Sequence, residues 1–437
     1  MLSVEDNELL TQVGPGTAIG ELLRRFWLPA ILEEEVAEPD GAPVKRRLLG
    51  GDLVAFKNTD GRIGILDAFC PHRRVHLYFG RNEECGLRCV YHGWKFDVDG
   101  NCVDMPSEPD ETNFAHKVKL SSYPAVARGG IVWIYMGPKG DNSKSISAPP
   151  DFEFTHLPEK RRTVTKRLQE CNWAQAVEGG IDSSHISFLH SSTDAQFAAN
   201  KNWAPRNRYH GLDRHPVFDV RDVDYGLLIA ARRNAEADSY YWRITQCLMP
   251  FYQMIPPVVP EDDSSKAPYS GHAWVPIDDE YTWTWTFSVN PHREFTEKEA
   301  ANLGGKAGMW GPVDDNYRPV RNRDNNYMLD REVQKNDNFT GITGIPNQDA
   351  AVQESMGFVV DRSREHLGQS DTAIIAWRRR IIEMAKMLRA GTEPPEAHHP
   401  KWYNVRSCST VLNLDQDWQE GTAWLRAGGD EPKAAEY

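Results

Sequence analysis

The chain has 437 residues, and its 63 acidic and 50 basic side chains give a formal net charge of −13. This balance is not the basic footprint of a nucleic-acid-binding protein, and it disfavours binding to an anionic membrane. No apolar run approaches the roughly 20 residues of a membrane helix, and the N-terminus lacks a secretory signal. The seven cysteines are an odd number and widely spread, so we expect a cytoplasmic protein without a disulfide framework.

Residues 1–40 predict a helical lead-in, because Thr17 can cap a helix whose apolar residues from Ile19 to Phe26 recur at helical spacing. A region of β character follows, which predicts a small all-β domain. Its strand patterns lie at 53–57, 62–66 and 131–135, with hairpin turns at 58–61 and 97–100.

Residues 138–150 are rich in Pro, Gly, Ser and Lys and form the best linker in the chain. Beyond it the pattern is mixed α+β. Helices are expected near 170–188, 348–357 and 371–389, and strands near 227–232, 240–246, 272–274 and 281–288.

Four potential metal ligands form two short motifs of the same kind. Cys70 and His72 flank Pro71, and after sixteen intervening residues Cys89 precedes His92 by three positions. A zinc finger pairs Cys with Cys and His with His, whereas here each loop contributes one of each. The mixed pairing favours a Rieske 2Fe-2S centre, in which two thiolates hold one iron and two imidazoles the other. A plain zinc site and four unrelated core residues are the alternatives.

The remaining cysteines have no such partners and are expected to be ordinary buried thiols. They are Cys85, Cys102, Cys171, Cys247 and Cys408.

A second group of ligand-type side chains lies within 170–190. Asp182 and His185 are three residues apart and would share one face of a helix. His185 and His190 are five apart, about 140° on a regular helix, so they can bind one metal only if the helix bends or ends near 188–190. Two His and a carboxylate from elsewhere would form the facial triad of a non-haem Fe(II) oxygenase. The alternative is a buried polar helix whose histidines are hydrogen bonded within the protein and bind no metal.

Together the two groups resemble the α subunits of Rieske non-haem iron ring-hydroxylating oxygenases, over most of the chain. Within that family, the runs at 344–355 and 361–368 are most similar to members that oxidise phthalate. The resemblance implies an α+β fold. A small all-β Rieske iron-sulfur domain at 41–140 would precede a larger α+β catalytic domain at 151–437, with an antiparallel sheet flanked by helices.

The resemblance also implies two cofactors, a Rieske 2Fe-2S cluster and a mononuclear Fe(II). Cys70 and Cys89 would bind one cluster iron and His72 and His92 the other. The mononuclear iron would be held by His185, His190 and, as third ligand, Asp349.

Spacing does not decide the third ligand, because several other carboxylates are near in sequence. The rivals are Asp330, Glu332, Asp337 and Glu354. A first-turn Asp that complements a helix dipole is the alternative interpretation of Asp349.

Two further residues match the family. Asp182 would bridge a mononuclear-iron His of its own chain and a cluster His, expected to be His92, of a neighbouring chain. Such carboxylates fix the tautomer and basicity of an imidazole. Asn172 matches a family Asn near the iron; a helix cap or buried amide is its alternative.

The partners follow from the same resemblance. The cluster would come from a neighbouring chain, so a homo-oligomer is expected, either a head-to-tail trimer or two stacked trimers. No Gly-x-Gly-x-x-Gly fingerprint follows a strand, so a separate NAD(P)H-dependent reductase must supply electrons. The substrates would be O2 and an aryl dicarboxylate, with cis-dihydroxylation of phthalate at carbons 4 and 5.

A dianionic substrate must be attracted locally, because the chain as a whole is acidic. Arg recognises carboxylates through two parallel hydrogen bonds. Arg243 lies in an aromatic strand pattern, and Arg206 and Arg208 lie in a loop downstream of the iron histidines, so these three are the expected substrate ligands. Exposed or ion-paired arginine is the alternative for each.

Three other functions remain open at the level of sequence. A Rieske monooxygenase or O-demethylase would act on another aryl carboxylate. A non-catalytic Rieske electron carrier would leave about 300 residues after the linker without a role. A zinc-stabilised binding protein would be colourless, whereas a Rieske protein is red-brown.

Overall fold

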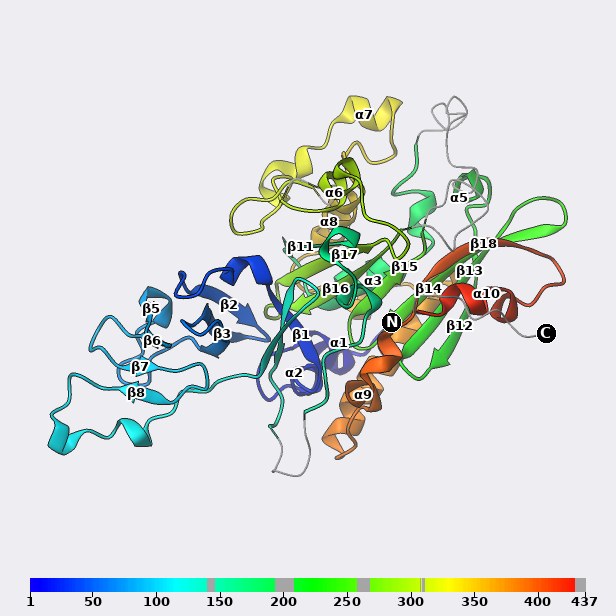
Figure 1. Ribbon diagram of the computed structural model, residues 1–437. Coiled ribbons are helices and arrows are strands. Elements are labelled where there is room, and N and C mark those ends of the chain that lie inside the picture. The colour runs from blue at the N-terminus through cyan, green and yellow to red at the C-terminus, as the bar shows by residue number, and fades with distance from the viewer. Residues whose placement is uncertain (140–145, 193–207, 258–267, 307, 309–310, 429–437) are drawn as a thin grey trace.

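The computed structural model describes residues 1–437 except 140–145, 193–207, 258–267, 307, 309–310 and 429–437. Small sheets from the first third of the chain lie to one side of a large sheet with its helices (Figure 1). This is the α+β architecture expected from the sequence, with an all-β part followed by an antiparallel sheet flanked by helices.

The first helices, α1 (Val4–Thr11) and α2 (Ala18–Leu23), pack against the late helix α9 (Thr372–Arg389). Thr17 caps α2 as expected, since its Oγ1 accepts a hydrogen bond from the backbone N–H of Gly20 at 3.1 Å. The lead-in is not a separate unit, however. Strand β1 (Trp27–Leu32) pairs antiparallel with β10 (Ile131–Tyr135), which also pairs with β9 (Ala125–Arg128).

The small domain contains two further antiparallel sheets. The first is β2 (Val44–Leu48), β3 (Gly51–Lys57) and β4 (Ile63–Asp67); the second is β5 (Arg81–Glu83), β6 (Gly86–Arg88), β7 (Lys95–Phe96) and β8 (Cys102–Asp104). Both predicted hairpins are present, β3–β4 around 58–61 and β7–β8 around 97–100. Gly61 has a φ of +80°, a conformation that favours glycine in such a turn.

The large sheet has the order β11-β17-β16-β15-β14-β13-β12, and β18 pairs with β14. Four of its strands were predicted; three of them are longer than expected, and β17 has the expected length but is shifted by one residue. They are β13 (Gly226–Asn234), β14 (Ser239–Leu248), β16 (Tyr269–Pro276) and β17 (Thr282–Val289). Four were not predicted: β11 (Arg162–Gln169), β12 (Val217–Val223), β15 (Tyr252–Ile255) and β18 (Cys408–Asn413).

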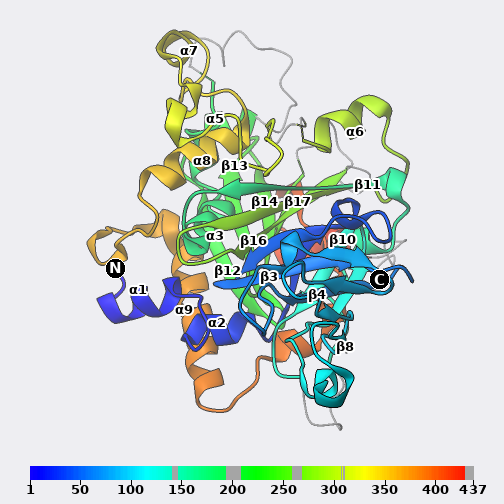
Figure 2. The same cartoon turned by 90° about the vertical axis from the view of Figure 1, so that its left-hand side faces the viewer.

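Helices cover the large sheet (Figure 2). Helix α3 (Trp173–Ile181) packs on β15 and β16, and α8 (Ile345–Ser355) packs on α3. The predicted helix at 371–389 is confirmed as α9, whereas the helix expected at 170–188 ends at Ile181. Further helices are α5 (Arg208–Leu212), α6 (Glu297–Leu303), α7 (Arg331–Asn336) and α10 (Trp418–Arg426).

Short 3-10 helices complete the described elements. They are Glu33–Val36, Leu77–Phe79, Asp110–Thr112, Ala115–Lys117, Glu153–Thr155, Glu159–Arg161, η7 (His185–Ser187), Arg323–Met328, Arg362–Arg364, Gln369–Asp371, Pro395–His398 and Pro400–Tyr403.

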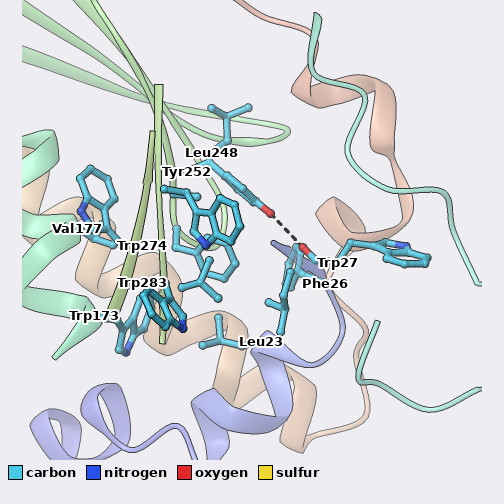
Figure 3. Close-up of a cluster of buried hydrophobic side chains, with 14 of the residues drawn as sticks. Leu23, Phe26, Trp27, Trp173, Val177, Leu248, Tyr252, Trp274 and Trp283 are labelled. Atoms are coloured by element: carbon cyan, nitrogen blue, oxygen red, sulfur yellow. Dashed lines mark hydrogen bonds between the residues drawn. The ribbon is translucent and has the colours of Figure 1, made fainter. Parts of the chain in front are cut away.

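One hydrophobic core joins the N-terminal segment to the large sheet (Figure 3). Leu23, Phe26 and Trp27 belong to the same cluster of buried side chains as Trp173 and Tyr252, and the Tyr252 hydroxyl donates to the backbone oxygen of Trp27 at 3.0 Å. Within the residues that the structure describes, no helix has the length and apolar character that a membrane span requires.

Candidate metal centres and substrate cavity

Two tight loops hold the first ligand group. Cys70 follows β4, and its backbone oxygen accepts from the N–H of Arg74 at 2.9 Å. Cys89 follows β6, and its backbone oxygen accepts from the N–H of Gly93 at 3.0 Å. Gly93 has a φ of +78°, and a Cβ there would press against Pro106, so the second loop requires glycine.

The donor atoms of these loops fit a Rieske cluster. The Cys70 and Cys89 thiols are hydrogen bonded, and that bond, followed by the backbone N–H groups of Tyr91 and His92, lowers the pKa of Cys89 against the opposing effect of burial. The rings of His72 and His92 lie 4.3 Å apart between centroids. Nδ1 of His72 is buried and has no hydrogen-bond partner, as expected of an atom that binds a metal. Two thiols and two imidazoles therefore converge on one place.

The second group brings three ligand atoms together from distant segments. Nε2 of His185 and Nε2 of His190 lie 3.1 Å apart. Oδ1 of Asp349 lies 3.3 Å from the His190 atom and 3.6 Å from the His185 atom. Neighbouring ligands about 2.1 Å from an octahedral metal are separated by roughly 3 Å, so the set matches one face of such an ion.

The end of α3 explains how His185 and His190 meet. The helix stops at Ile181, and Oδ1 of Asp182 accepts from the N–H of Ser184 at 2.6 Å in the turn that follows. The chain then enters η7, where the N–H of Leu189 donates to the backbone oxygen of His185 at 2.8 Å. The histidines are therefore on a tight turn rather than on a regular helix, which removes the 140° separation.

Two glycines let α3 approach its neighbours. A Cβ at Gly179 would overlap the side chain of Gln353 on α8, and a Cβ at Gly180 would overlap Trp274 on β16. This close approach sets the histidine turn beside α8, where Asp349 lies.

Helix α8 supplies Asp349 and a neighbour that orients a histidine. Oε1 of Gln348 lies 2.7 Å from Nδ1 of His190. Among the carboxylates within the described ranges, the rivals are not near the histidines. Asp330 caps α7, accepting from the N–H of Glu332 at 2.8 Å, and Glu354 accepts from the Tyr327 hydroxyl and the Glu170 N–H. Glu332 and Asp337 are exposed beside α7.

Neighbouring charges shift the pKa values of His185 and Asp349 in opposite directions. Burial lowers the pKa of His185, but the nearby carboxylates of Asp182 and Asp349 outweigh it and raise the pKa overall. Burial raises the pKa of Asp349, but His190, His185 and Arg167 outweigh it and keep the carboxyl ionised. Oδ2 of Asp182 lies 3.6 Å from Nδ1 of His185, the ring atom that faces away from Asp349.

The triad opens into a cavity of about 570 Å³ over one face of the large sheet. Arg243, on β14, lines it, is 8% exposed, and has an Nε without a hydrogen-bond partner. Arg208 is not among the lining residues; it is half-exposed, and its guanidinium pairs with Glu236 at 2.6 Å. Arg206, the remaining expected ligand, falls outside the described residues.

Asn172 is buried away from the cavity. It caps α3 through the N–H of Ala174, and its amide nitrogen donates to the backbone oxygens of Thr11 and Asp279 at 2.9 and 2.6 Å. The structure thus shows the helix cap that was the alternative interpretation.

Several residues of the site were not anticipated, among them Gln348, Arg167 and His272. Gln348 directly precedes Asp349, so its position next to an expected iron ligand could have indicated its role from the sequence. Arg167 and His272 line the cavity from β11 and β16. Arg167 gave no signal, because β11 is rich in Thr, Lys and Arg and has the composition of an exposed segment.

Two family models match successive parts of the chain. The family model described as "Rieske [2Fe-2S] domain" matches residues 26–124. The model described as "LigXa C-terminal domain like" matches residues 134–434, which contain the triad and the cavity.

Relatives are similar along nearly the whole length. The phthalate 4,5-dioxygenase oxygenase subunit of Pseudomonas putida is 42% identical over 433 residues, 96% of this chain and 94% of that protein. The 3-chlorobenzoate-3,4-dioxygenase oxygenase subunit of Comamonas testosteroni is 35% identical, covering 96% and 97%. Dicamba monooxygenase bound to dicamba shares the fold, with a TM-score of 0.59 at 20% identity over 84% of this chain and 99% of that chain.

Proposed function

Because the chain belongs to the family of Rieske oxygenase subunits, we propose that it is the terminal oxygenase that cis-dihydroxylates phthalate to the 4,5-dihydrodiol. It is an aromatic ring-hydroxylating enzyme with a Rieske cluster and a mononuclear iron. The phthalate substrate is supported by the relative from Pseudomonas putida and by the cavity.

The observation behind this proposal is one cavity that contains both three side chains able to hold a metal ion and a buried guanidinium whose Nε has no hydrogen-bond partner among the described residues. His185, His190 and Asp349 form the triad, and Arg243 offers the cation. A buried charge without a partner is unfavourable, and an aryl carboxylate would supply the missing partner.

In this proposal the residues of the chain bind and orient the substrate, and they fix the orientation and protonation of the two histidine rings. Gln348 fixes the His190 ring and Asp182 fixes the His185 ring, each through the ring nitrogen away from the iron. Arg243 holds the carboxylate end of the substrate, so that the ring carbons reach the triad. When bound, the cluster supplies single electrons and the ferrous iron activates O2.

The arrangement of the chain supports an oligomer. The sheet β5–β8 lies at the end of the molecule opposite α5 and α10, well away from α8 (Figure 1). A neighbouring subunit would therefore bring its cluster loops, with His92, to Asp182. We propose a homotrimer or two stacked trimers, with electrons from a separate NAD(P)H-dependent reductase.

A monooxygenase or O-demethylase acting on another aryl carboxylate is the second candidate. The 5,5'-dehydrodivanillate O-demethylase oxygenase subunit of a Sphingobium strain is 31% identical over 90% of this chain, which supports it. A non-catalytic electron carrier would have no use for the triad or the cavity.

Product analysis separates these functions. Holoenzyme with its reductase is given phthalate, isophthalate, benzoate and a methoxybenzoate, and the products are identified by NMR and mass spectrometry. We expect phthalate to yield a cis-dihydrodiol with one O2 consumed per NAD(P)H. Formaldehyde release from the methoxy compound, with phthalate untouched, would favour O-demethylation.

A further inference from the structure

A second guanidinium lines the same cavity without a partner. Arg167, on β11, is 7% exposed, and its Nη1 is buried with no hydrogen-bond partner. Within the described ranges of the chain, its guanidinium makes no hydrogen bond and no ion pair closer than 4.0 Å. Burial lowers the pKa of Arg167, which reflects the unfavourable desolvation of this cation.

Arg167 and Arg243 lie at different ends of the cavity. Arg167 is on the edge strand β11, Arg243 is on β14, and strands β17, β16 and β15 lie between them. The charge of Arg167 acts on Asp349, and the charge of Arg243 acts on His185. Atoms of those two residues lie 3.6 Å apart, so both guanidiniums act on the same triad.

The neighbours of Arg167 do not neutralise it through direct contact. Asp349 is directed at the two histidines, and Glu354 is engaged by the Tyr327 hydroxyl and the Glu170 N–H. The adjacent His272 stays neutral, because burial, followed by Arg167, lowers its pKa to about 4. Arg167 is thus a fixed cation facing the space in which an aryl substrate would lie.

We propose that Arg167 binds a second anionic group of the substrate, so that the cavity takes aryl dianions whose charged groups lie at opposite ends of the molecule. This inference rests on the proposed aryl carboxylate function and extends it beyond ortho-dicarboxylates. A cavity of about 570 Å³ has the size of sites for drug-like ligands, which leaves room for more than a single phthalate ring.

The test compares matched ligands that differ by one remote carboxylate. Calorimetry on the anaerobic holoenzyme measures Kd for benzoate against terephthalate, and for biphenyl-4-carboxylate against biphenyl-4,4'-dicarboxylate. In the unmodified enzyme we expect at least one dicarboxylate to bind about tenfold or more tightly than its monocarboxylate. In Arg167→Met this advantage should disappear, with the monocarboxylate Kd changed less than twofold.

Three controls make the result specific. Arg167→Lys keeps the charge and should retain part of the advantage, and Arg208→Met, at the surface, should retain all of it. Iron content separates substrate binding from support of Asp349: it should be unchanged in Arg167→Met.

Two outcomes would overturn the inference. One is a loss of iron, or an equal weakening of all ligands, in Arg167→Met, which would make Arg167 a counter-charge for Asp349. The other is the absence of any dicarboxylate advantage in the unmodified enzyme. Failure of every aryl carboxylate to bind would instead contradict the proposed function itself.

Discussion

The side-chain oxygen of Gln348 lies 2.7 Å from Nδ1 of His190, one residue before Asp349 on the same helix. The Gln348 amide nitrogen donates to the backbone oxygen of Ile342 at 2.9 Å, so the oxygen must face the imidazole. His190 therefore keeps its proton on Nδ1 and presents the Nε2 lone pair to the metal position. A single helix thus supplies one of the proposed iron ligands, Asp349, and fixes the tautomer of another, His190.

Removal of this contact should weaken iron binding. In Gln348→Leu we expect the affinity for ferrous iron to fall about 10- to 100-fold, because His190 loses the partner that sets its tautomer. Iron content after dialysis and anaerobic iron titration of the apoprotein measure the effect. Gln419→Leu, at an exposed position of α10, is the matched control. Unchanged iron affinity in Gln348→Leu would show that the hydrogen bond is dispensable.

The bridging role of Asp182 can be tested separately from iron binding. Asp182→Asn keeps a side-chain oxygen for the Ser184 N–H, so the turn should persist. We expect both metals to be retained, while oxidation of the reduced cluster slows about 100-fold or more with substrate and O2 present. Stopped-flow absorbance of the cluster measures this. Rapid cluster oxidation in the variant would count against the bridge.

We expect opposite results from substituting Arg243 and Arg208, the two candidate substrate ligands that the structure describes. Arg243→Ala should raise the KM for phthalate about tenfold or more and change that for a monocarboxylate analogue much less, because Arg243 is buried in the cavity. Arg208→Ala should leave both constants unchanged, since its guanidinium pairs with Glu236 at a half-exposed site. Steady-state kinetics with the reductase check both variants. An unchanged phthalate KM in Arg243→Ala would remove that residue from the substrate site.

A buried ion cluster should set the acid stability. Glu178 accepts from Arg362 at 2.9 and 3.0 Å and from Arg378 at 2.7 Å. Burial raises the pKa of Glu178, but the two arginines outweigh it and hold the pKa below its ordinary value. The folded pKa is thus below the unfolded one, so the stabilisation is complete above about pH 4.5 and is lost as the pH falls further.

Glu178→Gln would remove the negative charge that pairs with the buried Arg362 and Arg378. We expect the free energy of unfolding to drop by about 3–5 kcal/mol near neutral pH. The difference from the unmodified protein should shrink as the pH falls from about 4.5 through the lower folded pKa of Glu178, because the unfolded chain takes up the proton first. Urea denaturation across pH 3.5–7 measures this, with Glu297→Gln, exposed on α6, as control. Equal stability of the two variants would contradict the argument.

The sequence by itself determined the parts of the protein that depend on neighbouring residues. The spacing of Cys70, His72, Cys89 and His92 indicates the cluster because two short loops are enough to present the ligands. Thr17 as a cap, the hairpin at 58–61 and helix α9 were likewise predictable, since caps, turns and amphipathic faces depend on a few consecutive side chains.

Only the tertiary structure decided the contacts that join distant segments. Asp349 is 159 positions from His190, and only the packing of α8 on α3 through Gly179 and Gly180 selects it over its rivals as the carboxylate near the histidines. The same holds for the arginines: Arg208 looked equivalent to Arg243 in sequence, yet one lies at the surface and the other in the cavity. Arg167 was missed because burial of a cation depends on which strands close over it, and local residue pattern does not contain that information.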